Sequence, residues 1–316
     1  MLKNYLISAL RNITKSPFYA FLNIAALAVG LTTFIFIFIY VSDELTYDKY
    51  HDKHERIYRL ESDYTIGSKH DEFAIVPIPM GPALKIEYPE IEEFVRFDNM
   101  DNVLIKVGEK EFYEDDFYFT DSTIFEIFSH KLIMGNLEGS LVEPNTAVLT
   151  HSIANKYFGN ENPIGLLIET GGGRHFKITA VIEDLPGNSH LKFNALFSGT
   201  TLAKELGEEE FNSLEPGRFW NIGVYTYVLL NKNSSIETIQ EKFPQFYEKY
   251  MKSVGDQFNA SFDLKTTQLG DVHLTSKLAA DLPTGNISYV YIFSAVALFI
   301  LLLAAINYMN MATARS

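Results

Sequence analysis

Two long apolar segments lie near the two ends of the chain, and a polar region separates them. Residues 16–42 and 287–306 contain no charged side chain. About 20 apolar residues in a helix, at a rise of about 1.5 Å per residue, match the roughly 30 Å hydrocarbon core of a bilayer. The pattern therefore predicts two transmembrane helices, at 18–42 and 287–310, with region 43–281 as one large extramembrane domain.

The first apolar segment also follows basic residues, as the apolar core of a secretory signal peptide does. It is longer than the usual signal core of about 7 to 15 residues. It continues into Val41, Ser42, Asp43 and Glu44, which do not form a small-x-small cleavage site. We therefore interpret it as a retained membrane anchor.

The first 15 residues carry a separate pattern. Apolar residues recur there at helical spacing, at Leu2, Leu6, Leu10 and Ile13. Basic residues lie elsewhere around the helical wheel, which is typical of an amphipathic helix in a membrane interface. We expect a cytoplasmic amphipathic helix at 1–15, interrupted by Pro17 before the first span. The alternative is a basic tail without regular structure.

Region 43–281 has a mixed pattern of short strands and helices. Runs rich in β-branched and aromatic residues predict strands at 57–64, 103–107, 147–150, 176–182 and 225–230. Apolar residues at helical spacing predict helices at 47–56, 80–88, 122–128, 152–158, 202–214 and 236–250. The chain therefore reads as an α+β membrane protein, and the length of this region favours two packed subdomains.

Charge separates the ends of the chain from its middle. Lys3, Arg11 and Lys15 precede the first span, Arg315 follows the second, and neither flank contains an acid. All 40 acids lie in 43–281 with the other 22 basic residues, which gives 22 − 40 = −18 there and −14 for the whole chain. Basic flanks resist translocation, so both termini are expected in the cytoplasm. The acidic domain is not expected to bind nucleic acid.

Catalytic and metal-binding patterns are weak. His51 and His54 have a spacing that could place two imidazoles on one helical face, but the surrounding charges alternate in sign as on a solvated helix. Gly171, Gly172 and Gly173 lack the Lys and Ser/Thr of a phosphate loop and predict a hairpin turn. The chain has no cysteine. We expect no catalytic, cofactor-binding or metal-binding residue, and therefore not an enzyme.

Several longer motifs resemble one known family. They are 16–24 (SPFYAFLNI), 28–31 (AVGL), 40–48 (YVSDELTYD), 57–60 (IYRL), 143–150 (EPNTAVLT), 156–165 (KYFGNENPIG), 181–190 (VIEDLPGNSH) and 306–316 (INYMNMATARS). In this order they resemble the N-terminal half of MacB/FtsX-type ABC transporter permeases, from the first transmembrane helix through a MacB-like periplasmic core domain to the second transmembrane helix.

The resemblance implies a location and a function. It implies a bacterial inner-membrane protein with a periplasmic domain, and a non-catalytic permease subunit that couples cytoplasmic ATP hydrolysis to periplasmic export or mechanotransmission. The implied partners are a separate cytoplasmic ABC ATPase, a second permease copy or C-terminal permease half, the lipid bilayer and periplasmic or outer-membrane proteins. The family has four spans, so we expect either a split subunit or a truncated permease.

The resemblance, together with the irregular stretch 215–221, also places the two subdomains. We expect a membrane-proximal subdomain from 43–120 plus 225–281 and an inserted one from 121–223. The helix-packing candidates are Ala26, Gly30, Ala304, Ala305 and Asn307, because small residues and amides let membrane helices approach each other. The alternative function is a two-span periplasmic sensor or adhesion protein. A membrane-anchored enzyme is disfavoured for lack of a catalytic constellation.

Overall fold

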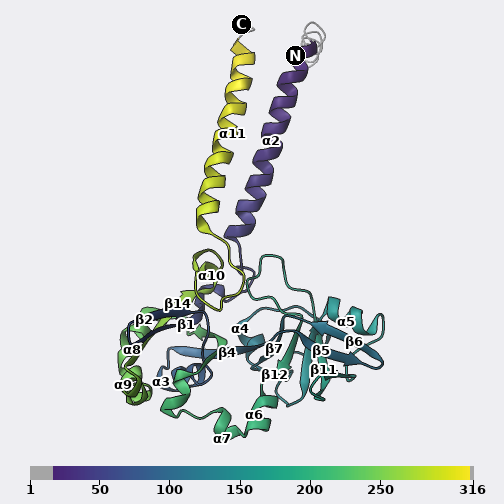
Figure 1. The fold of residues 1–316 in the computed structure, drawn as a ribbon. Coiled ribbons are helices and arrows are strands. Elements are labelled where there is room, and N and C mark those ends of the chain that lie inside the picture. The colour runs from purple at the N-terminus through teal and green to yellow at the C-terminus, as the bar shows by residue number, and fades with distance from the viewer. Residues whose placement is uncertain (1–16, 314–316) are drawn as a thin grey trace. The chain divides into compact units, whose positions relative to one another are not determined.

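The computed structural model describes residues 17–313, so the predicted helix at 1–15 and Arg315 lie outside the described residues. The chain divides into two compact units. The first, called the helical unit here, consists of the described residues up to Thr46 and from Gly285 onward. The second unit is the domain 47–284. Figure 1 shows the elements of each unit.

The helical unit consists of two long apolar helices. Helix α2 spans Pro17–Leu45 and helix α11 spans Ile287–Thr313. Within them, Phe21–Leu45 and Ile287–Met309 are long and apolar enough to cross a membrane. The helices run antiparallel, since Tyr40 contacts Phe293 while Gly30 faces Ala304. Two apolar helices therefore flank a mixed α/β domain, and the predicted fold class of a two-span membrane protein is confirmed.

One sheet runs through the domain 47–284. Its strands follow the order β14-β1-β13-β4-β7-β12-β9-β11-β10-β5-β6, while β2 pairs with β1, β3 with β13 and β8 with β11. The pairs β7/β12 and β9/β11 are parallel, and the others are antiparallel. The strands are β1 (Ile57–Ile66), β2 (Lys69–Phe73), β3 (Val76–Pro77), β4 (Ile91–Met100), β5 (Val103–Val107), β6 (Lys110–Glu114), β7 (Phe117–Thr120), β8 (Leu132–Gly135), β9 (Thr146–Thr150), β10 (Leu167–Thr170), β11 (His175–Ile182), β12 (Ala195–Ser198), β13 (Ile222–Leu230) and β14 (Ala260–Gln268).

This continuous sheet corrects the predicted division into 43–120 plus 225–281 and 121–223. Strand β7 ends the first predicted segment, yet it pairs with β4 on one side and with β12 on the other, Tyr118 lying opposite both Asn99 and Leu196. Strand β5 likewise pairs with β10. Hydrogen bonds therefore cross the predicted boundary, and 47–284 forms one compact unit. The sequence signal at 215–221 marks a turn, the 3₁₀ helix η2 (Pro216–Trp220), and no domain border.

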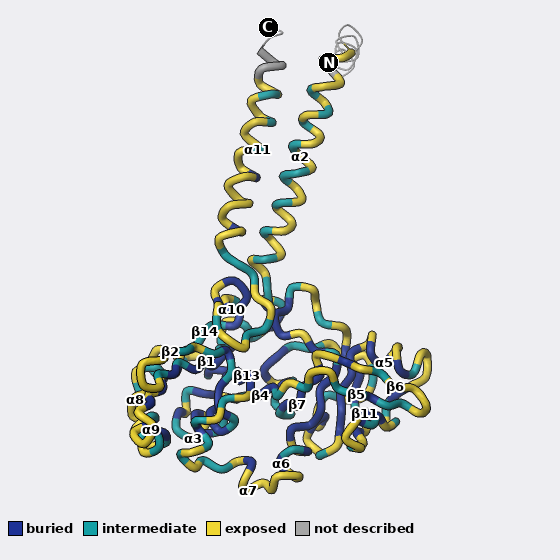
Figure 2. Tube along the Cα trace, viewed as in Figure 1, coloured by how far each residue is buried: buried dark blue, intermediate teal, exposed yellow. Residues whose placement is uncertain are grey.

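Short helices cover the sheet and complete three hydrophobic cores, visible as buried segments in Figure 2. Helix α8 shows how the sequence builds one of them. Its apolar residues Ile239, Phe243 and Phe246 recur on one face, and Phe243 packs against Phe262 of β14. Burying each such side chain contributes roughly 1.5–3 kcal/mol. The helices are α3 (Met80–Glu87), α4 (Ile124–Ile127), α5 (His151–Phe158), α6 (Thr200–Leu206), α7 (Glu208–Phe211), α8 (Ile236–Tyr250), α9 (Lys252–Phe258) and α10 (Leu269–Thr275).

The predicted helix at 47–56 is wrong. The structure has turns there, followed only by the short 3₁₀ helix η1 (His54–Arg56). Its charge alternation suggested a solvated helix, but Asp48 and His51 are buried. Asp48 also has a φ of +59°, which a helix does not allow. Tertiary hydrogen bonds of these two side chains, described below, replace the helical ones.

Candidate functional site

The two apolar helices approach each other at small residues. A Cβ atom added to Gly30 would lie 3.6 Å from Cβ of Ala304 and 3.7 Å from Cγ2 of Ile300. Gly30 therefore faces α11 at van der Waals distance. Ala26, Gly30, Ala304 and Asn307 all line one groove between α2 and α11. The fifth packing candidate, Ala305, is exposed and does not line the groove.

Two amides line this groove, Asn23 of α2 and Asn307 of α11. Among the side chains that the structure describes, which leave out 19–20 and 310–313, neither amide has a hydrogen-bond partner. An unpaired amide in hydrocarbon is costly, so polar groups in membrane helices usually pair across a helix interface. The groove therefore offers two hydrogen-bonding groups to a further apolar helix.

The segment after α2 is held in the domain by a buried carboxylate, here called the Asp48 anchor. Only Thr46 and Tyr47 separate Asp48 from the end of α2 at Leu45. The Asp48 carboxylate accepts hydrogen bonds from Nδ1 of His190 at 2.8 Å, from the His190 backbone N–H at 3.1 Å and from the Ser189 hydroxyl at 3.2 Å. Three donors satisfy a carboxylate that would otherwise be costly to bury.

The Asp48 anchor continues into the sheet. Nε2 of His190 lies 2.7 Å from the hydroxyl of Tyr227, which is on β13. Burial raises the pKa of Tyr227 well above its usual range, so its hydroxyl stays protonated. A carboxylate can only accept, which places a proton on Nδ1 of His190, while Nε2 makes the contact with the Tyr227 hydroxyl. Asp48, His190 and Tyr227 thus form a chain of buried hydrogen bonds.

The segment before α11 is held by a buried ion pair, here called the Asp281 anchor. Nη1 of Arg59 lies 2.7 Å from Oδ1 of Asp281, and the Arg59 side chain is fully buried. The same guanidinium donates to Oε1 of Glu61 at 2.8 Å and to the Ser276 hydroxyl at 2.7 Å. Backbone bonds between Ala74 and Ala279 and between Ala279 and Glu72 hold the same segment on the sheet. Residues 282–286 separate this anchor from Ile287, the first residue of α11.

One residue of each anchor belongs to a pair of neighbouring positions in the sheet. Arg59 on β1 and Tyr227 on β13 are register partners in the antiparallel pair of these strands. Arg59 belongs to the Asp281 anchor and Tyr227 to the Asp48 anchor. The chain segments next to the two apolar helices are therefore both held by side chains from adjacent positions of one sheet.

The histidines considered in the sequence do not face a common point. Nδ1 of His51 accepts from the Ser129 backbone N–H at 3.0 Å, and Nδ1 of His54 lies 2.9 Å from the His51 carbonyl oxygen. Burial lowers the pKa of His51 to about 4, and that of the nearby His130 to about 3. Both imidazoles are therefore neutral at pH 7. His51 accepts a hydrogen bond, and His130 packs against the rings of Phe125 and Phe193.

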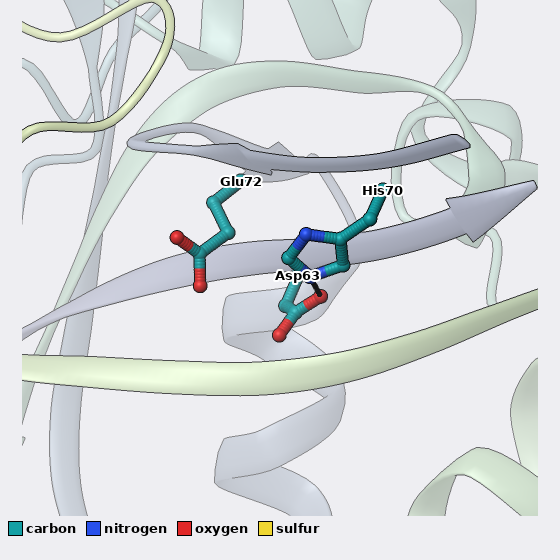
Figure 3. Close-up of side chains that lie close together, drawn as sticks. All are labelled: Asp63, His70 and Glu72. Atoms are coloured by element: carbon teal, nitrogen blue, oxygen red, sulfur yellow. Dashed lines mark hydrogen bonds and ion pairs between the residues drawn. The ribbon is translucent and has the colours of Figure 1, made fainter. Parts of the chain in front are cut away.

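One cluster of possible metal ligands lies elsewhere among the described residues. Asp63, His70 and Glu72 place one ligand atom each within 4.8 Å of one another. Figure 3 shows the three side chains close together. They lie on β1 and β2, and sequence analysis did not select them. Only the pairing of the two strands brings them together.

Sequence analysis also missed the residues of both anchors. Arg59, Asp48 and His190 each lie inside a motif that carried the family resemblance, at 57–60, 40–48 and 181–190. Their motif membership was the available signal. Their partners Tyr227 and Asp281 are far away along the chain, so no local pattern could have paired them.

The comparisons with known proteins agree with this architecture. Residues 20–246 match the MacB-like periplasmic core domain family. A search of curated proteins found no match. Among solved structures, the fold is similar to a domain of a protein described as a permease from Porphyromonas gingivalis, with a TM-score of 0.60, 19% identity and coverage of 77% of this chain and 98% of that chain.

Two further solved structures match less closely. The periplasmic region of MacB from Actinobacillus actinomycetemcomitans has a TM-score of 0.46 and 17% identity, covering 68% of this chain and 89% of that chain. The extracellular domain of the ABC-type transporter YknZ from Gram-positive bacteria has a TM-score of 0.41 and 11% identity, covering 65% and 99%. The family match spans well over half of the sequence, so the chain belongs to the MacB-like periplasmic core domain family of ABC transporter permeases.

Proposed function

We propose that this chain is a non-catalytic permease subunit that couples ATP hydrolysis by a separate cytoplasmic ABC ATPase to work in the periplasm, either export or mechanotransmission. In this proposal both termini are cytoplasmic and the domain 47–284 is periplasmic. The basic residues that flank the spans support this orientation, since Lys and Arg resist translocation.

The observation that carries the proposal is the pair of buried anchors. Movement of α2 or α11 reaches the domain through Thr46 and Tyr47 on one side and through 282–286 on the other. At roughly 3.5 Å per extended residue, these linkers span at most about 7 and 18 Å, so both connections between a helix and the domain are short. The second linker begins at Asp281, which is bonded to Arg59 of β1, and the first ends at Asp48, which is bonded through His190 to Tyr227 of β13. Such a construction suits transmission of helix movement into the sheet.

The groove between α2 and α11 supports a partner inside the membrane. Small residues let another helix approach closely, and the amides of Asn23 and Asn307 are available to it. We propose that a helix from a second permease copy or from a C-terminal permease half packs along this groove. Periplasmic or outer-membrane partners would bind the domain.

Affinity isolation of the full chain from its native membrane tests the proposal. We expect an ABC ATPase to be recovered with the wild-type chain and with Arg59→Met, because the anchors are remote in sequence from the cytoplasmic ends. The Arg59→Met variant should lose transport-dependent activity while keeping the ATPase. Lys252→Met is the matched control, since it breaks the exposed ion pair of Lys252 with Glu248.

Topology is tested separately in the same strains. The chain has no cysteine, so a single cysteine at Gly171 can be labelled without background. We expect a membrane-impermeant maleimide added from the periplasmic side to label it. Labelling only after the inner membrane is opened would contradict the orientation, and recovery of no ATPase would favour the sensor or adhesion alternative.

A further inference from the structure

The outward face of three neighbouring strands concentrates ionisable groups around Asp63. Strand β1 lies between β2 and β14, and Asp63 is the register partner of Glu72 on one side and of Asp263 on the other. Tyr64, Phe262 and Leu264 are buried on the opposite face and pack in a hydrophobic core. The alternation of a strand therefore places Asp63, Glu72 and Asp263 together toward solvent.

This arrangement is electrostatically unusual. Carboxylates directly opposite each other across a sheet are destabilising, and Asp63 has one on each side. Two basic side chains lie next to these carboxylates. Nε2 of His70 lies 2.7 Å from Oδ1 of Asp63, and Nζ of Lys265 lies 2.9 Å from Oδ2 of Asp263 and 3.7 Å from Oδ2 of Asp63.

Glu72 is the carboxylate of this group that neither basic side chain contacts. Its carboxylate has no hydrogen bond or ion pair among the described residues, yet one of its oxygens lies within 4.8 Å of ligand atoms of Asp63 and His70. Figure 3 shows its carboxylate and the His70 imidazole, both from β2, on the same side as the Asp63 carboxylate from β1. A carboxylate, a second carboxylate and an imidazole thus face one point from two paired strands.

We propose that Asp63, His70 and Glu72 bind a divalent transition-metal ion, with Zn²⁺ as the best fit. Zn²⁺ takes imidazole nitrogen at about 2.0–2.1 Å and carboxylate oxygen at about 2.0–2.2 Å, so side-chain rotations that bring the three atoms together are sufficient. Imidazole favours Zn²⁺ over Ca²⁺ and Mg²⁺, which prefer oxygen ligands. The exposure of His70 and Glu72 leaves the remaining coordination positions to water.

A bound ion would change two interactions in this cluster. It neutralises the opposed carboxylates of Asp63 and Glu72, and it takes over the contact that His70 now makes with Asp63. The ion would also join β2 to β1 through side chains, in addition to the backbone ladder from Ser62 to Ile66. Metal binding therefore stabilises the β1–β2 hairpin.

Titration of the full-length, untagged chain in detergent with Zn²⁺, after treatment with a chelator, tests the site. We expect saturation at one equivalent in the wild type. Removing a residue that only hydrogen-bonds to a metal ligand typically lowers metal affinity by about 10–100-fold. His70→Gln removes a ligand itself, so it should weaken Zn²⁺ binding by at least about 10-fold. The matched control is His175→Gln, an exposed histidine on strand β11, which should bind as the wild type does.

A second variant is expected to change affinity in the opposite direction. Lys265→Met removes the ammonium that competes for Asp63, so Zn²⁺ should bind several-fold more tightly. Replacing Zn²⁺ by Co²⁺ gives a visible absorption band that reports ligands directly, and this band should be absent in His70→Gln. Circular dichroism establishes that each variant is folded.

Three results would overturn the site. One is equal Zn²⁺ affinity in His70→Gln, His175→Gln and the wild type. Another is the absence of saturable binding. The third is displacement of Zn²⁺ by equimolar Ca²⁺, which would assign the cluster to carboxylates alone. None of these results affects the recovery of an ATPase, so the metal site and the proposed permease function are tested independently.

Discussion

Arg59 and Tyr227 lie directly opposite each other on β1 and β13. Arg59 is bonded directly to the segment before α11, whereas Tyr227 is bonded to His190, which in turn is bonded to the segment after α2. Arg59 holds Asp281 ahead of α11. Tyr227 holds Asp48, through His190, just after α2. Side chains at adjacent positions of one sheet therefore hold the two segments that connect the domain to the apolar helices.

The buried ion pair of Arg59 and Asp281 should contribute much more to folding than a surface pair. Removing one partner leaves an uncompensated buried charge, so Asp281→Asn and Arg59→Met should each lower the free energy of unfolding by about 3–5 kcal/mol. Lys252→Met, at an exposed and solvent-screened pair, should lower it far less. Urea unfolding of the full chain in detergent, followed by tryptophan fluorescence of Trp220, measures both. Equal effects of the buried and exposed variants would contradict the assignment.

Asp48 should be replaceable only in part. Asparagine tolerates positive φ and keeps one acceptor oxygen, whereas alanine does neither. Asp48→Asn should therefore destabilise the domain less than Asp48→Ala, which leaves the backbone N–H and the Nδ1 of His190 without their acceptor. Melting temperatures of the two variants, measured side by side, provide the comparison. The reverse order would show that the carboxylate is not the acceptor that the domain requires.

Stability should fall in mild acid because of His51 and His130. Burial lowers their pKa values to about 4 and about 3, whereas in the unfolded chain they titrate near 6.5. Below about pH 6.5 the unfolded state therefore binds protons that the folded state does not, and stability decreases from about pH 6.5 down to about 4 for His51 and 3 for His130. His51→Gln should flatten the pH dependence of the unfolding midpoint above pH 4. If the pH dependence of the unfolding midpoint is the same in His51→Gln as in the wild type, protonation of His51 is not the cause of the acid sensitivity.

Packing in the membrane should depend on the groove residues. Gly30→Leu adds carbons where a Cβ already touches Ala304, and Asn307→Leu removes an amide whose hydrogen bond to a partner helix would contribute about 0.6–2 kcal/mol. Both should reduce recovery of a crosslinked permease complex without unfolding the domain. Ala305→Leu, outside the groove, is the control. Loss of the complex with Ala305→Leu alone would place the interface on the other face of α11.

The parts of the fold that the sequence predicted are those with a strong local pattern. The apolar runs of α2 and α11 and the β-branched runs of β9, β11 and β13 specify their structures by composition. Strand β14 was missed because its outward positions, such as Asp263 and Lys265, are charged and dilute its apolar face. The helix expected at 47–56 failed because burial of Asp48 and His51 depends on partners outside that segment.

The anchors and the metal cluster could not be predicted because tertiary structure, and not local sequence, brings their residues together. Arg59 and Asp281 are separated by 222 positions, and Asp48 and His190 by 142. Asp63, His70 and Glu72 are close in sequence, but only the register of β1 with β2 decides which side chains share a face. Sequence motifs marked several of these residues without indicating what they bind.

Hydrogen exchange of the backbone in the isolated complex tests the central claim most directly. The claim is that nucleotide binding by the ATPase reaches the periplasmic domain through the two anchors. Adding a nonhydrolysable ATP analogue should change amide exchange in segments 46–54 and 276–284 of the wild-type chain, and Arg59→Met should abolish the change in 276–284 while the ATPase remains bound. Identical exchange with and without the analogue in both anchor segments, in a complex that binds nucleotide, would contradict the account.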